Sequence, residues 1–254
     1  MPFTAAHVVA VLPAMRWHRA LRLDPTCLAI GAMAPDFEYF FRGELVGTIG
    51  HTFLGILVWG VPVTLALAAA YHHVVKWPVL LALPRRLAPV FAAPWVLSWK
   101  SVVSAALGDL THLLWDGATH AKGIITRHVP PLTVAYDVPV LGRMVLHRIL
   151  QHASTAVGLA ILAWVFVRAV RRHAAPPVDD VPRLRVRIAL AACVAAGVAA
   201  MALRLRAMNI DDPGSYIAGM ISGVLAGAIV ASLIARADGR RFRARLLPET
   251  ATAA

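Results

Sequence analysis

Apolar runs as long as a bilayer is thick restrict this chain to a small set of folds. The clearest run covers residues 52–75, and a spanning helix needs about 20 apolar residues. Other runs lie at residues 154–170, 186–203 and 216–235, and one more begins near Trp95. Backbone groups in lipid must satisfy their own hydrogen bonds, and ten-residue segments of alternating hydropathy do not occur. We therefore expect an all-α, polytopic membrane helical bundle with about five spanning helices plus short N-terminal helices.

Charge is scarce in the sequence, and most of it is basic. Only 15% of the 254 residues are charged and 59% are hydrophobic, whereas a soluble domain carries about 25% charged residues. The formal net charge of +12 comes largely from arginines. These arginines flank apolar runs and lack interleaved aromatic residues. Membrane lipids, with anionic headgroups at the basic loops, are therefore the expected partners, and nucleic acid is not.

The apolar and basic segments divide the chain into four consecutive parts. Residues 1–170 are expected to form a membrane-embedded domain with the functional site, and residues 171–185 a basic, proline-rich linker. Residues 186–236 are expected to form a two-helix membrane anchor, in which small residues permit close helix packing. Residues 237–254 are expected to be a basic, disordered tail.

Four ionisable residues form a stripe near the middle of the chain. Asp109, His112, Asp116 and His120 follow one another at steps of three, four and four. In a helix they lie within an arc of roughly 80° on one face. Such a stripe is costly to bury without compensation, and a divalent metal compensates it because imidazole and carboxylate are common ligands. The alternative is a polar helix face that lines water or pairs with arginine.

Further candidate residues lie outside this stripe. His7 lies near the N-terminus, Asp36 ends an Ala-Pro-Asp motif, and His51 directly precedes the first span. Taken alone, His7 is better interpreted as a surface histidine, and Asp36 as a helix cap. Gln151 and His152 lie in the first turns of a long expected helix, and we expect them to face the site.

Arginine clusters indicate the orientation of the chain. One cluster covers residues 168–187 and another begins at Arg236, and the positive-inside rule places both in the cytoplasm. All the candidate residues then lie toward the extracytoplasmic face. The basic residues of segments 1–51 and 121–150 lie on the outer side in this orientation and argue for the reverse.

Five motifs carry a family resemblance. They are Met1-Pro-Phe-Thr…His7, Gly31-Ala-Met-Ala-Pro-Asp36, Gly50-His51-Thr52, the stretch from Ser104 to His120, and Leu150-Gln-His-Ala-Ser154. With these motifs the chain resembles a family of bacterial membrane proteins, the domain of unknown function 4184, over roughly residues 1–170. The central motif is also similar to that of membrane-bound metal-dependent hydrolases, and more distantly to zinc-dependent phospholipase C. The resemblance implies a multi-pass protein of the bacterial cell (inner) membrane.

The first functional hypothesis is a membrane-bound metal-dependent hydrolase that acts on an ester or phosphoester at the membrane surface. One or more divalent ions, with zinc as the expected metal, would be held by His7, Asp36, His51, His112, Asp116 and His152. Asp109 and His120 are expected to be catalytic, as further ligands, orienting groups or the general base. A bound divalent ion lowers the pKa of water to about 7.

Two alternatives belong to other classes of protein. An ion, proton or metal carrier would use the same His/Asp cluster, because ionisable residues inside a membrane mark ion pathways. A carrier would spread them across the bilayer, however, and the sequence has no inverted repeat. A non-catalytic membrane scaffold would hold a purely structural polar cluster. The distance of His7 and His51 from Asp116 is a first test, since a separation above about 10 Å excludes shared ligation.

Overall fold

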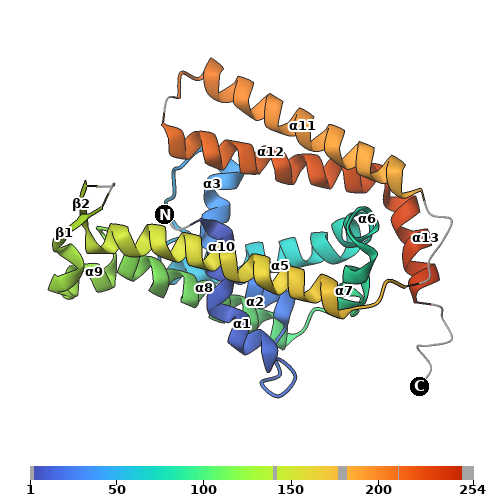
Figure 1. The fold of residues 1–254 in the computed structure, drawn as a ribbon, viewed down its shortest axis with the longest axis horizontal. Coiled ribbons are helices and arrows are strands. Elements are labelled where there is room, and N and C mark those ends of the chain that lie inside the picture. The colour runs from blue at the N-terminus through green and yellow to red at the C-terminus, as the bar shows by residue number, and fades with distance from the viewer. Residues whose placement is uncertain (1–2, 140–141, 177–181, 211, 248–254) are drawn as a thin grey trace. The chain divides into compact units, whose positions relative to one another are not determined.

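The computed structural model describes residues 3–139, 142–176, 182–210 and 212–247, and these residues are mostly helical (Figure 1). The chain forms two compact units. The first consists of residues 1–37, 47–68 and 97–165, and the second of residues 38–46, 69–96 and 166–254. Each unit combines separate stretches of sequence, so the units do not follow the four consecutive parts expected above.

Each unit combines short helices with long ones. The first unit contains η1 (Thr4–His7), α1 (Val8–Arg16), α2 (Pro25–Gly31), η2 (Ala34–Asp36), α4 (Phe53–Gly55), η3 (Ile56–Gly60), most of α5 (Val61–Ala70), α8 (Trp99–Thr119), α9 (Ile124–His128), η6 (Pro130–Thr133), β1 (Ala135–Val138), β2 (Gly142–Val145) and most of α10 (Leu146–Arg172). The second contains most of α3 (Phe37–Arg42), then η4 (Tyr71–Val75), α6 (Lys76–Ala82), η5 (Arg85–Leu87), α7 (Ala88–Phe91), α11 (Arg183–Ala207), α12 (Pro213–Ile234) and α13 (Arg236–Leu246).

Four helices in the described residues are long and apolar enough to cross a membrane. They are Phe53–Ala82, Leu146–Arg172, Arg183–Ala207 and Pro213–Ile234. These helices identify an all-α membrane protein, as the sequence predicted. The fifth expected span does form a helix, α8, but it falls outside this set. The reason is its ionisable stripe, which lowers the mean hydropathy.

The first span continues through two prolines, each of which follows a wide, π-helical turn. Pro62 comes after η3, and Pro78 comes after η4. A proline ring clashes with the carbonyl four residues earlier, and those carbonyls belong to Val58 and Val74, inside the π turns. A π turn shifts such a carbonyl from its α-helical position. The helix therefore continues beyond Val75, although the prolines of residues 76–94 predict a loop there from sequence alone.

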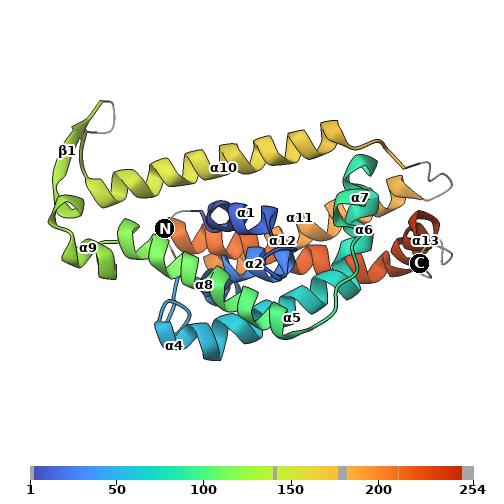
Figure 2. The same ribbon diagram turned by 90° about the horizontal axis from the view of Figure 1, so that it is seen from below.

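In the first unit α2 lies against α8 (Figure 2), and glycines lie at their contact. A Cβ added to Gly31 would lie 2.5 Å from the carbonyl oxygen of Ala105, and one added to Gly108 would lie 2.5 Å from that of Leu28. Both distances are shorter than any van der Waals contact. The two backbones can therefore approach this closely only because both positions lack a side chain.

Asp24 ties the start of α2 to α8. Its carboxylate accepts the N–H groups of Thr26 at 3.0 Å and Cys27 at 3.1 Å, as a helix cap does. The Ser101 hydroxyl of α8 donates to the same carboxylate at 2.8 Å, and the Asp24 N–H donates to Ser104 at 2.8 Å. These contacts fix the register of α8 against the N-terminal helices.

A short β-hairpin interrupts the connection between α8 and α10. Strands β1 and β2 pair antiparallel, with Ala135 opposite Val145 and Val138 opposite Gly142. From sequence alone, Pro130, Pro131, Pro139 and Gly142 predict an irregular connection over residues 121–142. Two strands of only four residues are too short to give a clear pattern against these residues. The connection instead contains α9, η6 and the hairpin.

In the second unit α11 and α12 form a close antiparallel pair (Figure 1). A Cβ on Gly223 would lie 2.5 Å from the carbonyl oxygen of Gly197. The close packing that the sequence predicted for small residues is thus present. The pair also contacts α3, because the Ser222 hydroxyl donates to the carbonyl of Phe40 at 2.6 Å.

Residues 236–246 form helix α13, although the sequence suggested a disordered tail from residue 237. Phe242 is 1% exposed and packs with Leu80, Leu81 and Val186. This apolar contact stabilises a helix that its arginine-rich sequence alone would not. Residues 248–254 of the expected tail lie outside the described residues.

Candidate metal centre

The ionisable stripe of α8 faces the interior of the first unit. Asp109 and His112 are fully buried, Asp116 is 7% exposed, and His120 follows the last residue of the helix. Apolar residues on other faces, such as Leu107 and Leu114, are exposed. The stripe therefore has the orientation that its spacing predicted, with the polar side chains inward.

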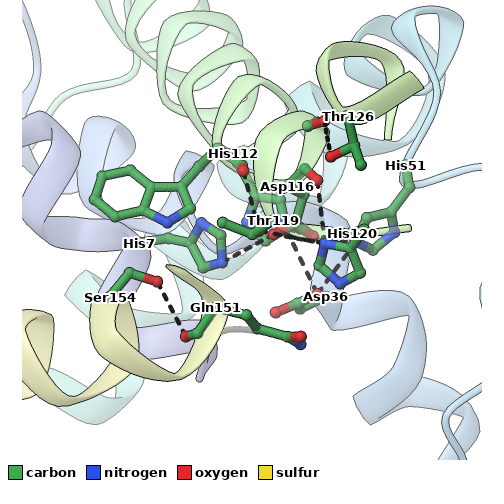
Figure 3. Close-up of polar contacts among 12 residues, drawn as sticks. His7, Asp36, His51, His112, Asp116, Thr119, His120, Thr126, Gln151 and Ser154 are labelled. Carbon is green, nitrogen blue, oxygen red and sulfur yellow. Dashed lines mark hydrogen bonds and ion pairs between the residues drawn. The ribbon is translucent and has the colours of Figure 1, made fainter. Parts of the chain in front are cut away.

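Three more candidate residues reach the stripe from separate elements (Figure 3). His7 ends η1, Asp36 ends η2, and His51 lies just before α4. His7 and Asp36 are buried, at 1% and 0% exposure. The buried positions exclude the separate interpretations of His7 as a surface residue and of Asp36 as an isolated helix cap.

Asp116 lies at the centre of the cluster, and its two oxygens have different neighbours. Oδ1 lies 3.5 Å from Nε2 of His7 and 3.5 Å from Nδ1 of His120. Oδ2 lies 3.4 Å from Nε2 of His112 and 3.6 Å from Nε2 of His51. One carboxylate thus contacts four imidazoles, two on each oxygen.

Asp36 completes a ring on the Oδ2 side. Its Oδ1 lies 3.3 Å from Nε2 of His51 and 3.6 Å from Nε2 of His112. Carboxylates and imidazoles therefore alternate in the order Asp36, His51, Asp116 and His112. The expected convergence of four separate segments is present in the structure.

The separations in this cluster are too long for good hydrogen bonds. An N–H···O bond measures about 2.7–3.2 Å, and a charge-assisted one is shorter still. The observed distances of 3.3–3.6 Å fall within the roughly 3–4 Å that separates two ligands of one zinc ion. Donor atoms of Asp36, His51 and His112 all lie within 4.8 Å of one another, as do those of His7, His112 and Asp116.

Two hydrogen bonds orient the cluster from outside. The Thr4 hydroxyl donates to Oδ2 of Asp36 at 2.6 Å, which leaves Oδ1 to face the histidines. Nδ1 of His112 lies 2.9 Å from the carbonyl oxygen of Ala32. Nδ1 must carry the proton to donate there, so in a neutral ring Nε2 is the nitrogen left to bind a cation between the two carboxylates. Such outer contacts are characteristic of metal-binding residues.

The sequence did not single out these two supporting groups. Position alone suggests Thr4 as the cap of the N-terminal helix, but η1 has no side-chain cap. The Ala32 carbonyl is a backbone group, and no residue type marks it. Thr4 precedes His7 by three residues, and a hydroxyl so close to a candidate ligand was the one available signal.

His7 lies face to face with His112. Their ring centroids are 3.9 Å apart and their planes differ by 14°. Neither ring nitrogen of His7 has a hydrogen-bond partner among the described residues. Burial, and next the neighbouring His112 charge, lower the pKa of His7 to about 3. The ring is therefore neutral at physiological pH, which is the form that binds metal.

The side chains of the cluster differ in exposure. The side chains of His112 and Asp36 are fully buried, whereas those of His51 and His120 are 26% and 31% exposed. Water and a small group can thus approach from the side of His51 and His120.

Two expected site residues take other positions. His152 is exposed on α10, and it is the half-buried Gln151 whose side chain points toward the Asp36 side of the cluster (Figure 3). Consecutive helix residues point about 100° apart, so both cannot face the site. Asp109 is buried, but the described ion pairs do not include it, and its carboxylate lies against Gly60.

The fold and the cluster together define a class of protein: an all-α membrane protein with a buried group of His and Asp side chains at distances compatible with metal binding. The chain belongs to the family described as "Domain of unknown function (DUF4184)", whose model matches residues 1–235. The match extends past the resemblance at residues 1–170 and includes α11 and α12. Searches of curated proteins and of solved structures found no match, so no homologue supports the likeness to metal-dependent hydrolases or phospholipase C.

Proposed function

We propose that the protein is a membrane-bound, metal-dependent hydrolase that acts on an ester or phosphoester at the membrane surface. The observation that carries the proposal is the set of His–Asp pairs at 3.3–3.6 Å. A purely structural cluster would close these pairs to hydrogen bonds, because buried polar groups left unpaired cost about 1–3 kcal/mol each. A shared cation accounts for separations that hydrogen bonding does not.

The donor set favours zinc among common metals. Asp36 Oδ1, His51 Nε2, His112 Nε2 and Asp116 Oδ2 supply two imidazoles and two carboxylates, ligand types that zinc takes in proteins. Asp36 and Asp116 together balance the charge of one divalent ion. A bound ion of this kind would lower the pKa of water to about 7 and polarise a substrate oxygen.

His120 is the better placed of the two residues expected to be catalytic. Its side chain is 31% exposed and contacts Asp116, so it can bind a metal ion or, in the absence of that bond, exchange a proton with a substrate or a water molecule. Asp109 is fully buried and has no route to a substrate. We assign it a supporting electrostatic role in the folded helix.

The same geometry disfavours the alternative of a carrier. The cluster residues His7, Asp36, His51, His112 and Asp116 all lie outside the four candidate spans. A transport pathway would need ionisable groups at several depths of the bilayer, and the cluster provides them at one place. The partly exposed opening fits a substrate that arrives from the membrane surface.

Metal analysis of the purified full-length protein in detergent tests this function. Wild type should contain tightly bound zinc and hydrolyse bis(p-nitrophenyl) phosphate or p-nitrophenyl butyrate. Asp116→Asn and His112→Ala should lose the metal and the activity. His152→Ala changes an exposed histidine of α10 and serves as the matched control, with metal and activity retained. Wild-type protein that binds no metal after zinc reconstitution would refute the proposal.

The proposed location is a bacterial inner membrane, with the cluster toward the extracytoplasmic face and the arginine-rich α13 beside anionic headgroups of the cytoplasmic leaflet. Cysteine labelling of intact cells tests the orientation. Arg241→Cys in α13 should be shielded from an impermeant thiol reagent, and Met208→Cys between α11 and α12 should react. Both positions are exposed in the structure. The opposite pattern would place the site in the cytoplasm.

A further inference from the structure

Asp116 presents its two oxygens to two different sets of histidines, and the proposed zinc position uses only one of them. Oδ2 belongs to the ring with Asp36, His51 and His112. Oδ1 lies 3.5 Å from both His7 and His120. A single ion in the ring leaves the Oδ1 contacts unexplained.

The stacking of His7 on His112 indicates where a second ion would lie relative to the first. Two nearly parallel rings, with centroids 3.9 Å apart, direct their Nε2 atoms to the two oxygens of one carboxylate. Ions bound to two such nitrogens would lie side by side at about the separation of the rings. In two-metal enzyme sites the ions are about 3.5–4 Å apart.

The burial of His7 makes an empty second position costly. The residue is 1% exposed, and both of its ring nitrogens lack a hydrogen-bond partner among the described residues. A buried polar ring without compensation is unfavourable. A ligand bond from Nε2 to a cation would remove that cost.

His120 is the other imidazole beside Oδ1 of Asp116 and is the candidate third ligand of this position. Its Nδ1 lies 3.5 Å from Oδ1 of Asp116 and 3.1 Å from the carbonyl oxygen of the same residue. In the tautomer with the proton on Nδ1, the ring donates a hydrogen bond to that carbonyl. In the tautomer with the proton on Nε2, the lone pair of Nδ1 can bind a cation. Metal binding would select the second tautomer.

From these observations we infer that the centre holds two divalent ions bridged by Asp116. Asp36, His51 and His112 complete the first position, and His7 and His120 complete the second. This inference rests on the proposed function and makes it more specific. Asp36 and Asp116 contribute a charge of −2, so two divalent ions leave the centre at +2 and favour a dianionic or monoanionic phosphoester over a neutral carboxylic ester.

The test is metal stoichiometry, measured by mass spectrometry of protein reconstituted with zinc and then freed of excess metal. Wild type should hold two zinc ions per chain. His7→Gln and His120→Gln should each hold one, whereas His51→Gln should lose the first position and retain at most one. His152→Ala is the control and should hold two. His120 is partly exposed, so its variant remains informative if His7→Gln fails to fold.

A second readout detects the bridge itself. Cobalt titration of wild type should end at two equivalents and give magnetically coupled ions, and in His120→Gln it should end at one equivalent without coupling. Inorganic phosphate should raise the melting temperature of the two-zinc wild type more than that of His120→Gln.

The outcomes separate the two claims. One zinc in wild type that His7→Gln and His120→Gln leave unchanged overturns the second position and leaves the hydrolase proposal standing. Two zinc ions in both wild type and these variants overturn the ligand assignment. No zinc in wild type overturns both claims.

Discussion

Replacing Thr4 by valine tests whether the cluster is built to hold a cation. Valine matches the shape of threonine but lacks the hydroxyl that donates to Asp36 at 2.6 Å. A hydrogen bond to a charged group contributes about 1.5–3 kcal/mol. Without it, Asp36 can rotate away from His51 and His112. Since about 1.4 kcal/mol corresponds to a tenfold change in affinity, zinc should bind about 10- to 100-fold more weakly, as for other outer contacts of metal ligands.

The assay is competition between the detergent-solubilised protein and a chromophoric zinc chelator. Thr126→Val is the matched control, because Thr126 is also buried and donates one hydrogen bond, at 3.2 Å to the carbonyl of Gly117. That variant should lose stability but keep its zinc affinity. Thr4→Ser keeps a hydroxyl and should restore most of the binding. Equal zinc affinity in wild type and Thr4→Val would refute the argument that Thr4 orients a ligand.

Three further predictions concern the scaffold. Gly60→Ala would place a Cβ 1.5 Å from Oδ2 of Asp109, so the apparent melting temperature in detergent should fall, with a loss of stability of about 1–3 kcal/mol. Adding Asp109→Ala should recover part of the lost stability. Equal losses in the single and double variants would contradict the contact. Asp24→Ala removes the cap of α2 and the acceptor for a hydroxyl of α8. We therefore expect the free energy of unfolding to fall by about 1–3 kcal/mol and amide exchange at the start of α2 to become faster. Unchanged exchange there would refute the role of the cap. Phe242→Ala should detach α13, since truncating a buried phenylalanine costs about 3–5 kcal/mol of stability. Trypsin should then cleave the tail much faster than in wild type. An unchanged cleavage rate would show that Phe242 does not hold the helix.

The parts of the fold that follow from local pattern were predictable from the sequence. The inward stripe of Asp109, His112 and Asp116 follows from helical periodicity, and the apolar spans follow from hydropathy. The helix at 236–246 was not predictable in this way, because contacts with another element, such as the burial of Phe242, stabilise it. Pro78 also misled the prediction, since its effect depends on the π turn before it.

The sequence predicted which residues form the candidate site better than it predicted how they are arranged. Motif resemblance brought together residues from four segments, and the structure places them within ion-pair distance. The choice between Gln151 and His152 depends on the rotation of α10, which the sequence of one helix does not determine. Likewise the different partners of the two Asp116 oxygens arise from tertiary packing and leave no trace in residue spacing.

The cluster joins two stretches that are distant along the chain. His7, Asp36 and His51 belong to the first 51 residues, and their partners lie in α8 and just beyond it. The described part of residues 1–51 contains no candidate span of its own. An ion that binds only the folded arrangement stabilises it by about 2.7 kcal/mol at a hundredfold excess over Kd, and it closes long loops as a disulfide would. Bound metal would then be a reversible cross-link between residues 1–51 and α8. It would keep these two parts associated even after the loop between α7 and α8 is cut.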